Sequence, residues 1–305
     1  MRSFLLLFFF FPFSNCDSSD PAVANEYRFH ATLTVGGITR TYLLVLPSTY
    51  YGSDTTTFPL VVGMHGTGGS ASQFDRDYGV TEKANSTHFI VAYPEGVQRE
   101  GRFNVRTWNA GTCCDYAMEN NIDDVGFIRA LIDLMISDYR ANARRVYITG
   151  MSNGGMLAYR LACEMPEKIA AMAAVSCSMM VDEPCDPSRS VPILHMHSKL
   201  DTKIPSDGGI GIGGYHYPPI DSVLDVWSRL NECESLPQVE VDNAAYKLTK
   251  WSTCDSNVTI QYYLTQDGGH SWPGGLKPQP RADEPSTAID ATDLMWTFFE
   301  QYQLP

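Results

Sequence analysis

The sequence predicts an α/β fold, in which a central and mostly parallel β-sheet carries helices on both faces. Short apolar runs of strand length alternate with segments whose apolar residues recur at helical spacing. Several of these runs are apolar throughout, as in Pro59–Met64, which is typical of strands buried on both faces. A Gly-x-Ser-x-Gly segment also stands between one such run and a helix. These observations indicate one enzyme-sized domain rather than a repeat or a chain of modules.

The expected elements follow one another without a repeat or an interdomain linker. Strands are expected near 29–36, 41–47, 59–64, 88–93, 145–149, 170–175, 191–196 and 258–264, with a small strand pair around 245–251. Helices are expected over 70–84, 124–139, 153–164, 220–231 and 286–301. Asp123 and Asp124 stand at the start of the second helix, where carboxylates favour capping and loop bracing over acid–base work.

The N-terminus is typical of a secretory signal peptide. Residues 4–13 are a short apolar run after Met-Arg-Ser, and Ala22-Val-Ala24 places small residues before a cleavage site. We therefore assign residues 1–24 to a signal peptide and 25–305 to a single catalytic domain, which makes the protein secreted. Cleavage nearer Ser14, or a bacterial lipoprotein site at Cys16, are alternatives.

Charge and hydropathy exclude some partners. The formal net charge is −13, which repels nucleic acid and anionic membrane surfaces. After the N-terminal run, no apolar stretch is long enough to span a membrane. We expect neither nucleic acid nor a membrane as the partner.

Eight cysteines in an exported chain indicate disulfides. Removal of Cys16 leaves seven, so at least one thiol stays free. Cys177 with Cys185 and Cys233 with Cys254 are candidate pairs, and Cys163 is expected to pair with Cys113 or Cys114. We do not expect Cys113 and Cys114, which are adjacent, to bond to each other. Their spacing does not match a metal site.

The segment Gly150-Met-Ser-Asn-Gly154 contains the first candidate catalytic residue. A serine on a tight turn between a strand and a helix has its hydroxyl lifted out of the sheet, and the flanking glycines avoid collisions there. Ser152 is therefore the candidate nucleophile of an α/β-hydrolase fold.

A serine hydroxyl needs a base, which this fold supplies from a loop after its last strand. His270 lies in such a loop. His30, His65, His88, His195 and His197 lie in or beside earlier strands or in the glycine loop, and His216 follows the expected acid too closely. His270 is the candidate base.

The acid should follow an earlier strand and precede the histidine. Asp201 comes a few residues after the expected strand 191–196, and Asp207 is the second choice. The glycine-rich loop His65–Gly69 is where the fold places one oxyanion donor, the amide of Thr67, and the amide of Asn153 after the nucleophile is the other.

With these residues in place, the sequence from about Tyr42 to Trp272 resembles the secreted polyhydroxybutyrate-depolymerase-like esterases, which are related to feruloyl and acetylxylan esterases. The matching segments are Pro59–Gly69, Tyr93–Gly96, Thr107–Gly111 with Cys113-Cys114, Asp123–Ile128, Thr149–Met156 and Gly269–Gly274. The resemblance carries Ser, Asp and His over to Ser152, Asp201 and His270 in the same order. Relatives usually have glycine where this chain has Ser198, which weakens the match around Asp201.

The resemblance implies hydrolysis of carboxylic esters, with hydroxyalkanoate oligomers or polymers as substrates and with no metal or cofactor. Feruloyl or acetylxylan esters, peptides, and a catalytically silent binding role are the alternatives. Trp108 and Trp272 are expected either to stack on substrate or to form the wall of its pocket.

Overall fold

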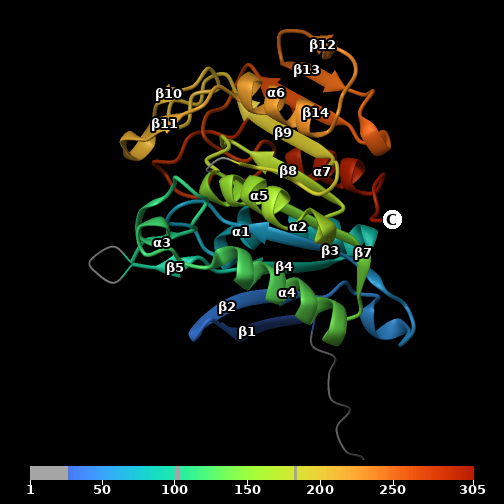
Figure 1. Ribbon diagram of the computed structural model, residues 1–305. Helices are drawn as coiled ribbons and strands as arrows, with labels where there is room; N and C mark the ends of the chain where they lie inside the picture. The colour runs from blue at the N-terminus through green and yellow to red at the C-terminus, as the bar shows by residue number, and fades with distance from the viewer. Residues whose placement is uncertain (1–26, 100–103, 182–183) are drawn as a thin grey trace, which may run out of the picture.

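A ten-stranded sheet forms the centre of the computed structural model, which describes residues 27–99, 104–181 and 184–305 (Figure 1). Its order is β1-β2-β4-β3-β7-β8-β9-β14-β13-β12. The strands are β1 Arg28–Val35, β2 Ile38–Val45, β4 Ile90–Pro94, β3 Phe58–Met64, β7 Ala141–Met151, β8 Ala171–Val175, β9 Ile193–Ser198, β14 Ile260–Thr265, β13 Tyr246–Trp251 and β12 Gln238–Asp242. The strands from β4 to β14 in this order pair in parallel, and the outer pairs are antiparallel. The predicted α/β-hydrolase fold is confirmed.

Helices cover both faces of the sheet, because alternate strand residues bury apolar side chains on opposite sides. Leu60 and Val62 of β3 face one core cluster, and Val61 between them faces the other. The first cluster is covered by α4 Asp124–Asp138, α5 Asn153–Glu164 and α6 Ile220–Leu230. The second is covered by α1 Ala71–Asp77, α2 Val80–Thr87 and α7 Ala291–Phe299.

Two expected helices differ from the structure at their ends. The helix expected over 70–84 is divided into α1 and α2 at Gly79, whose φ of +69° interrupts the helical backbone. The last helix begins at Ala291 rather than near 286, because Asp267 binds the preceding segment: its carboxylate accepts from the Thr287 amide at 2.8 Å.

Small elements around one edge of the sheet escaped the sequence analysis. They are β5 Val97–Gln98, β6 Arg106–Thr107, α3 Asp115–Glu119, β10 Gly209–Ile210 and β11 His216–Tyr217. Each strand contributes two residues, which is too short to show an alternating pattern. In Figure 1 they lie on the left, β10 and β11 in the upper part and α3 and β5 in the lower part.

The two acidic residues before α4 are structural, as predicted. Asp123 caps the helix and accepts from the Gly126 amide at 2.7 Å. Asp124 is fully buried and accepts from the Arg40 guanidinium and the Asn109 amide, both at 2.7 Å. It therefore fixes the start of α4 to the strand β2 and to the loop at Asn109.

The disulfides differ from the expected pairs in two places. Cys233 pairs with Cys254 as expected, but Cys185 pairs with Cys163 and not with Cys177. Cys177 points into the core, where its sulfur lies against Gly155 at the start of α5, and it is the buried free thiol of the described chain.

The adjacent Cys113 and Cys114 form a disulfide with each other, across a cis peptide bond. The expectations that they would not bond, and that one of them would bind Cys163, are therefore wrong. The Cys114 sulfur lies beside Asn153 and Met156 at the start of α5, whereas Cys163 lies in the last turn of this helix.

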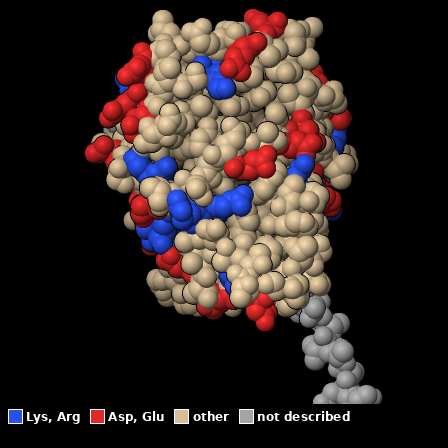
Figure 2. Space-filling model, turned by 90° about the vertical axis from the view of Figure 1, so that its right-hand side faces the viewer, with Lys and Arg blue, Asp and Glu red and all other residues tan. Residues whose placement is uncertain are grey.

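The signal peptide stays a prediction, because residues 1–24 lie outside the described residues. Among the described residues, no helix has the length and apolarity needed to cross a membrane. On the face in Figure 2, small groups of acidic and basic side chains lie next to one another between larger uncharged areas. The net charge of −13 is thus not a uniform acidic surface on this face.

Candidate active site

Ser152 lies between the end of β7 at Met151 and the start of α5 at Asn153. Its φ of 57° and ψ of −125° are unfavourable for a residue with a side chain, and this strain is typical of a functional turn. Neither flanking glycine has room for a side chain. A Cβ on Gly150 would lie 2.3 Å from the carbonyl carbon of Gly154, and one on Gly154 would lie 2.1 Å from the carbonyl oxygen of Met64.

The three residues expected to form a triad meet in one hydrogen-bonded row. His270 Nε2 lies 2.9 Å from Ser152 Oγ, and His270 Nδ1 lies 2.8 Å from Asp201 Oδ2. The residues follow β7, β9 and β14, all of which end at the same edge of the sheet. Ser152 and Asp201 are only 7% and 3% exposed, so the row is largely shielded from water.

Asp201 is held as a carboxylate by several donors. Its Oδ1 accepts from the amides of Lys203 and Ile204, each at 2.9 Å, while its Oδ2 faces His270 and, at 3.4 Å, His197 Nε2. Burial by itself raises the pKa of Asp201, but hydrogen bonds from the two histidines outweigh it and leave the pKa well below its ordinary value. Asp201 is therefore ionised across the neutral range.

The rival residues lie elsewhere. Asp207 is exposed, and His216 is exposed in β11; neither lines the cavity at Ser152.

Ser198, which stands where relatives usually have glycine, strengthens the turn before Asp201. Its hydroxyl donates to the carbonyl of Asp267 at 2.9 Å and accepts from the Leu200 amide at 3.0 Å.

Asp283 positions His270 and was missed by the sequence analysis. Its carboxylate accepts from the His270 amide at 2.8 Å and lies 3.3 Å from Lys203 Nζ. A Cβ on Gly269 would lie 2.7 Å from the Asp283 side chain, so this approach requires the glycine before the histidine. The sequence offers no signal for Asp283, because it lies in an irregular loop.

The glycine loop packs directly against Ser152. A Cβ on Gly66 would lie 3.2 Å from the Ser152 Cβ. His65 fixes this loop: its Nδ1 lies 2.8 Å from the carbonyl of Gly66, and its Nε2 accepts from the Gly96 amide at 3.0 Å. Thr67 follows at the edge of the cavity that contains Ser152.

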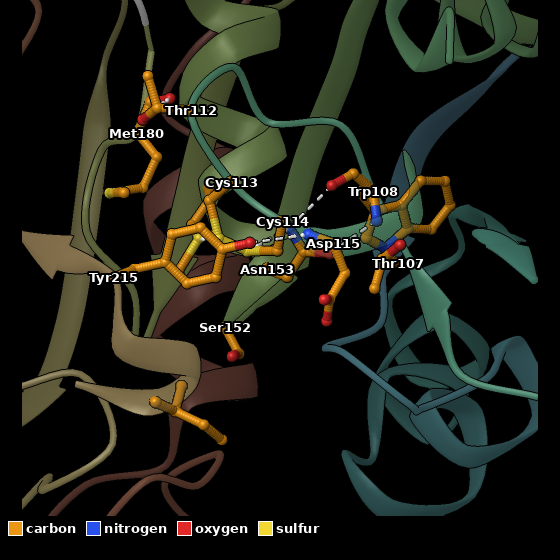
Figure 3. Close-up of a disulfide and its surroundings, with 12 residues drawn as sticks. Thr107, Trp108, Thr112, Cys113, Cys114, Asp115, Ser152, Asn153, Met180 and Tyr215 are labelled. Carbon is orange, nitrogen blue, oxygen red and sulfur yellow. Dashed lines mark hydrogen bonds between the residues drawn. A yellow bond between two sulfur atoms is a disulfide. The ribbon is translucent and has the colours of Figure 1, made fainter. Parts of the chain in front are cut away.

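Hydrogen bonds from its side chain hold Asn153 to the backbone of Trp108 (Figure 3). Its Oδ1 accepts from the Trp108 amide at 2.7 Å, and its Nδ2 donates to the Trp108 carbonyl at 3.0 Å. The same Nδ2 lies 3.4 Å from the Cys114 sulfur, whose disulfide with Cys113 lies beside it. The Tyr215 hydroxyl then accepts from the Asp115 amide at 3.0 Å and ties this segment to the hairpin before α6.

A cavity of about 510 Å³ opens above Ser152, a size suited to a small organic ligand. Its lining combines apolar and aromatic side chains with a few polar ones, namely Gln73, Tyr78, Asp115, Met151, Met156, Lys203, Ile212, Tyr215, Tyr217, Trp272, Gln279 and Arg281. The lining does not form a cluster of three or more potential metal ligands, nor does any other part of the described chain.

The two tryptophans differ in their relation to this cavity. Trp272 lines it, but the ring is 1% exposed and stacks on Tyr78, with centroids 4.8 Å apart. Trp108 is fully buried and does not line the cavity; its Nε1 donates to the carbonyl of His65 at 2.8 Å. Of the two roles expected for Trp108, contact with substrate or a place in the pocket wall, the structure shows neither, because the ring supports the glycine loop from within the core.

Comparison with known proteins identifies the family. The sequence profile of the esterase PHB depolymerase family matches residues 40–226. NocK of Nocardia uniformis subsp. tsuyamanensis, provisionally named an esterase, is 30% identical over 77% of this chain and 70% of its own length. Feruloyl esterase B of Piromyces equi is 26% identical over 87% of this chain, which spans 46% of that protein.

Solved structures share the fold at low identity. An acetyl xylan esterase from Aspergillus awamori superposes with a TM-score of 0.61 at 14% identity, over 89% of this chain and 99% of that one. Such a likeness establishes the fold, whereas the family follows from the profile match over more than half of the chain. The protein is therefore a carboxylic ester hydrolase that belongs to the esterase PHB depolymerase family.

Proposed function

We propose that the protein hydrolyses esters by nucleophilic catalysis, with Ser152 as nucleophile, His270 as general base and Asp201 as the acid that orients it. The observation that carries this proposal is the hydrogen-bonded row from Asp201 through His270 to Ser152, with distances of 2.8 and 2.9 Å. The amides of Thr67 and Asn153 are proposed as the oxyanion donors.

In this mechanism His270 Nε2 takes the Ser152 proton as Oγ attacks the ester carbonyl carbon. Negative charge develops on the carbonyl oxygen, where the two amides stabilise it in the transition state. The imidazolium then gives its proton to the leaving alcohol, and an acyl-serine remains. Water, activated by His270, attacks the acyl carbon, releases the acid and restores the serine hydroxyl.

Replacement of the nucleophile tests this proposal. Ser152→Ala should reduce hydrolysis of a short p-nitrophenyl ester to the background rate and leave the circular dichroism spectrum unchanged. Ser190→Ala is a matched control, since Ser190 is a buried serine whose hydroxyl bonds Asp255 far from the cavity. Wild-type rates in Ser152→Ala would refute the mechanism.

For the substrate, we propose esters of hydroxyalkanoate oligomers, on the basis of the family that the chain belongs to. Feruloyl or acetylxylan esters are the second candidate. They are favoured by the names of relatives such as feruloyl esterase B and by the aromatic side chains of Tyr78, Tyr215 and Tyr217 in the cavity lining.

A substrate panel separates the two candidates. The enzyme should be assayed with hydroxybutyrate trimer, methyl ferulate, acetylated xylan and a proline peptide, and kcat/KM compared. The highest kcat/KM on the trimer supports the first candidate, and the highest on methyl ferulate or acetylated xylan supports the second. Cleavage of the peptide alone would overturn both.

The enzyme is further proposed to act outside the cell. The support is a chain with three disulfides among its described residues and the predicted signal peptide at residues 1–24. Expression with the native N-terminus in a secreting host, followed by N-terminal sequencing of the protein in the medium, should show a chain that begins near residue 25.

A further inference from the structure

A row of buried polar side chains continues from the catalytic acid into the core. It consists of His197 and His195 on β9 and Tyr159 on α5, all fully buried. Tyr159 Oη lies 2.7 Å from His195 Nδ1, His195 Nε2 lies 3.2 Å from His197 Nδ1, and His197 Nε2 lies 3.4 Å from Asp201 Oδ2. The ester mechanism above uses none of these three side chains.

A backbone carbonyl fixes the hydrogen-bond role of the ring nitrogen that lies nearest Asp201. His197 Nε2 lies 2.8 Å from the carbonyl of Ile204, which can only accept, so this nitrogen carries a hydrogen. Burial, together with the nearby His197, lowers the pKa of His195 well below its ordinary value, so that ring is neutral. The two remaining contacts of the row join the Tyr159 hydroxyl to His195 Nδ1 and His195 Nε2 to His197 Nδ1, so the ring of His197 is held at both of its nitrogens.

His197 thereby connects the strand to the loop that presents the acid. Its Nε2–H binds the Ile204 carbonyl, and the Ile204 amide in turn donates to Asp201 Oδ1 at 2.9 Å. The same Nε2 faces Asp201 Oδ2, the oxygen that binds His270. One imidazole therefore contacts both the backbone and the carboxylate of the acid's turn.

Burial of this polar row in an apolar core costs folding free energy, which favours a functional reason for its presence. His195 and His197 stack with centroids 5.5 Å apart and planes 7° from parallel, and Tyr262 of β14 packs edge-on against His195. The neighbouring residues on β9, Leu194 and Met196, are apolar and face the opposite core cluster. Two imidazoles in such a core lose their hydration, and apolar side chains of similar size would pack there without that cost.

We propose that His197 is a positioning residue, held by His195 and Tyr159, which fixes the Asp201 carboxylate in line with His270. The proposal rests on the triad mechanism above and adds a second histidine partner for its acid. It predicts that His197 contributes to turnover through Asp201 without contacting the substrate, since His197 does not line the cavity.

Two substitutions at His197 separate positioning from packing. His197→Leu removes the donor, and kcat should fall about 10- to 100-fold with KM unchanged, as for other groups that orient a catalytic ligand. His197→Gln can place its amide N–H where Nε2 lies, and should recover most of kcat. Asn231→Leu is the control: Asn231 is buried and bonds the Val191 backbone twice, so its loss should lower Tm and leave kcat unchanged.

A spectroscopic readout follows the Asp201–His270 contact itself. The proton on His270 Nδ1, bonded to the carboxylate, should give a far-downfield proton resonance in the wild type. This resonance should shift upfield or vanish in His197→Leu and return in His197→Gln. A purely structural role for His197 would change Tm and leave the resonance in place.

The outcomes distinguish this proposal from the mechanism on which it rests. If Ser152→Ala is inactive while folded His197→Leu keeps wild-type kcat and resonance, the positioning role is refuted and the triad stands. If Ser152→Ala keeps its activity, the triad itself fails. Should His197→Leu not fold, Tyr159→Phe decides: a shifted resonance with kcat reduced supports the row, and both unchanged overturn it.

Discussion

Asn153 shows how one residue supports the site through two different groups. Its backbone amide is the proposed oxyanion donor at the start of α5, and its side-chain amide pairs with both polar groups of the Trp108 backbone. The side chain thus anchors the first residue of the helix to the loop that passes over it. A change in the side chain should therefore be felt by the backbone donor.

Asn153→Ala tests this link. The substitution leaves the buried amide and carbonyl of Trp108 without these partners, so the free energy of unfolding should fall by about 1–3 kcal/mol. Turnover of a p-nitrophenyl ester should fall at least 10-fold, because the donor shifts from its place in the oxyanion hole. Urea unfolding and steady-state kinetics measure the two effects. Unchanged kcat would show that the side chain does not position the donor.

The pKa of Asp201 predicts a pH dependence of stability. Because the folded-state pKa lies below the unfolded value of about 3.9, the ionised carboxylate stabilises the fold above that pH, and this stabilisation is lost as pH falls through the folded value. Asp201→Asn should therefore be less stable than the wild type by about 2 kcal/mol at pH 7. In urea unfolding at several pH values, the difference should shrink below about pH 4. A difference that is constant with pH would contradict this account.

At the scale of elements, the start of α5 is pressed against β3. The approach is possible because Gly154 has no side chain. A Cβ added there would lie 2.1 Å from the carbonyl oxygen of Met64 and 2.6 Å from that of His65. The contact brings the helix N-terminus and the glycine loop together on either side of Ser152. Both proposed oxyanion donors therefore depend on one helix–strand contact.

Gly154→Ala should disrupt that contact. The added methyl group forces α5 away from β3, with a cost of about 3 kcal/mol and a fall in Tm of about 5–10 °C. The ester-hydrolysis rate should fall with it, since the donors move apart. Gly52→Ala is the matched control, because a Cβ there meets nothing within 4 Å, and its Tm should stay at the wild-type value. Scanning calorimetry measures both variants, and equal Tm values would refute the steric argument.

At the scale of the whole molecule, the site joins segments that are distant in sequence. His270 is separated from Ser152 by 118 positions and from Asp201 by 69. They meet because β7, β8, β9 and β14 are neighbours in the sheet and run parallel. Two of the disulfides lie away from this meeting point: Cys163–Cys185 links the last turn of α5 to the segment before β9, and Cys233–Cys254 links the segments that follow α6 and β13.

The buried position of Cys177 predicts that its thiol does not react in the folded protein. Cys177 is fully buried, and burial, followed by the charge of Asp201, raises the pKa of its thiol well above the ordinary value. In mature protein without Cys16, a colourimetric thiol reagent should detect no thiol in the native state and one in denaturant. Peptide mapping without reductant should recover Cys163 linked to Cys185. A thiol that reacts in the native state would place Cys177 outside the core.

Local periodicity and a motif beside a strand end were enough to predict the main strands and helices along the chain, the turn at Ser152, and the positions of Ser152, Asp201 and His270 after strand ends. The expectations were wrong for Trp108, for every cysteine pair except Cys233–Cys254, and for the extents of two helices. Those features depend on which side a residue faces and on what packs against it. Other features join segments that share no sequence pattern, so they are visible in the folded chain alone: Asp283 beside His270, the paired hydrogen bonds of Asn153 with Trp108, and the buried row from Tyr159 to His197.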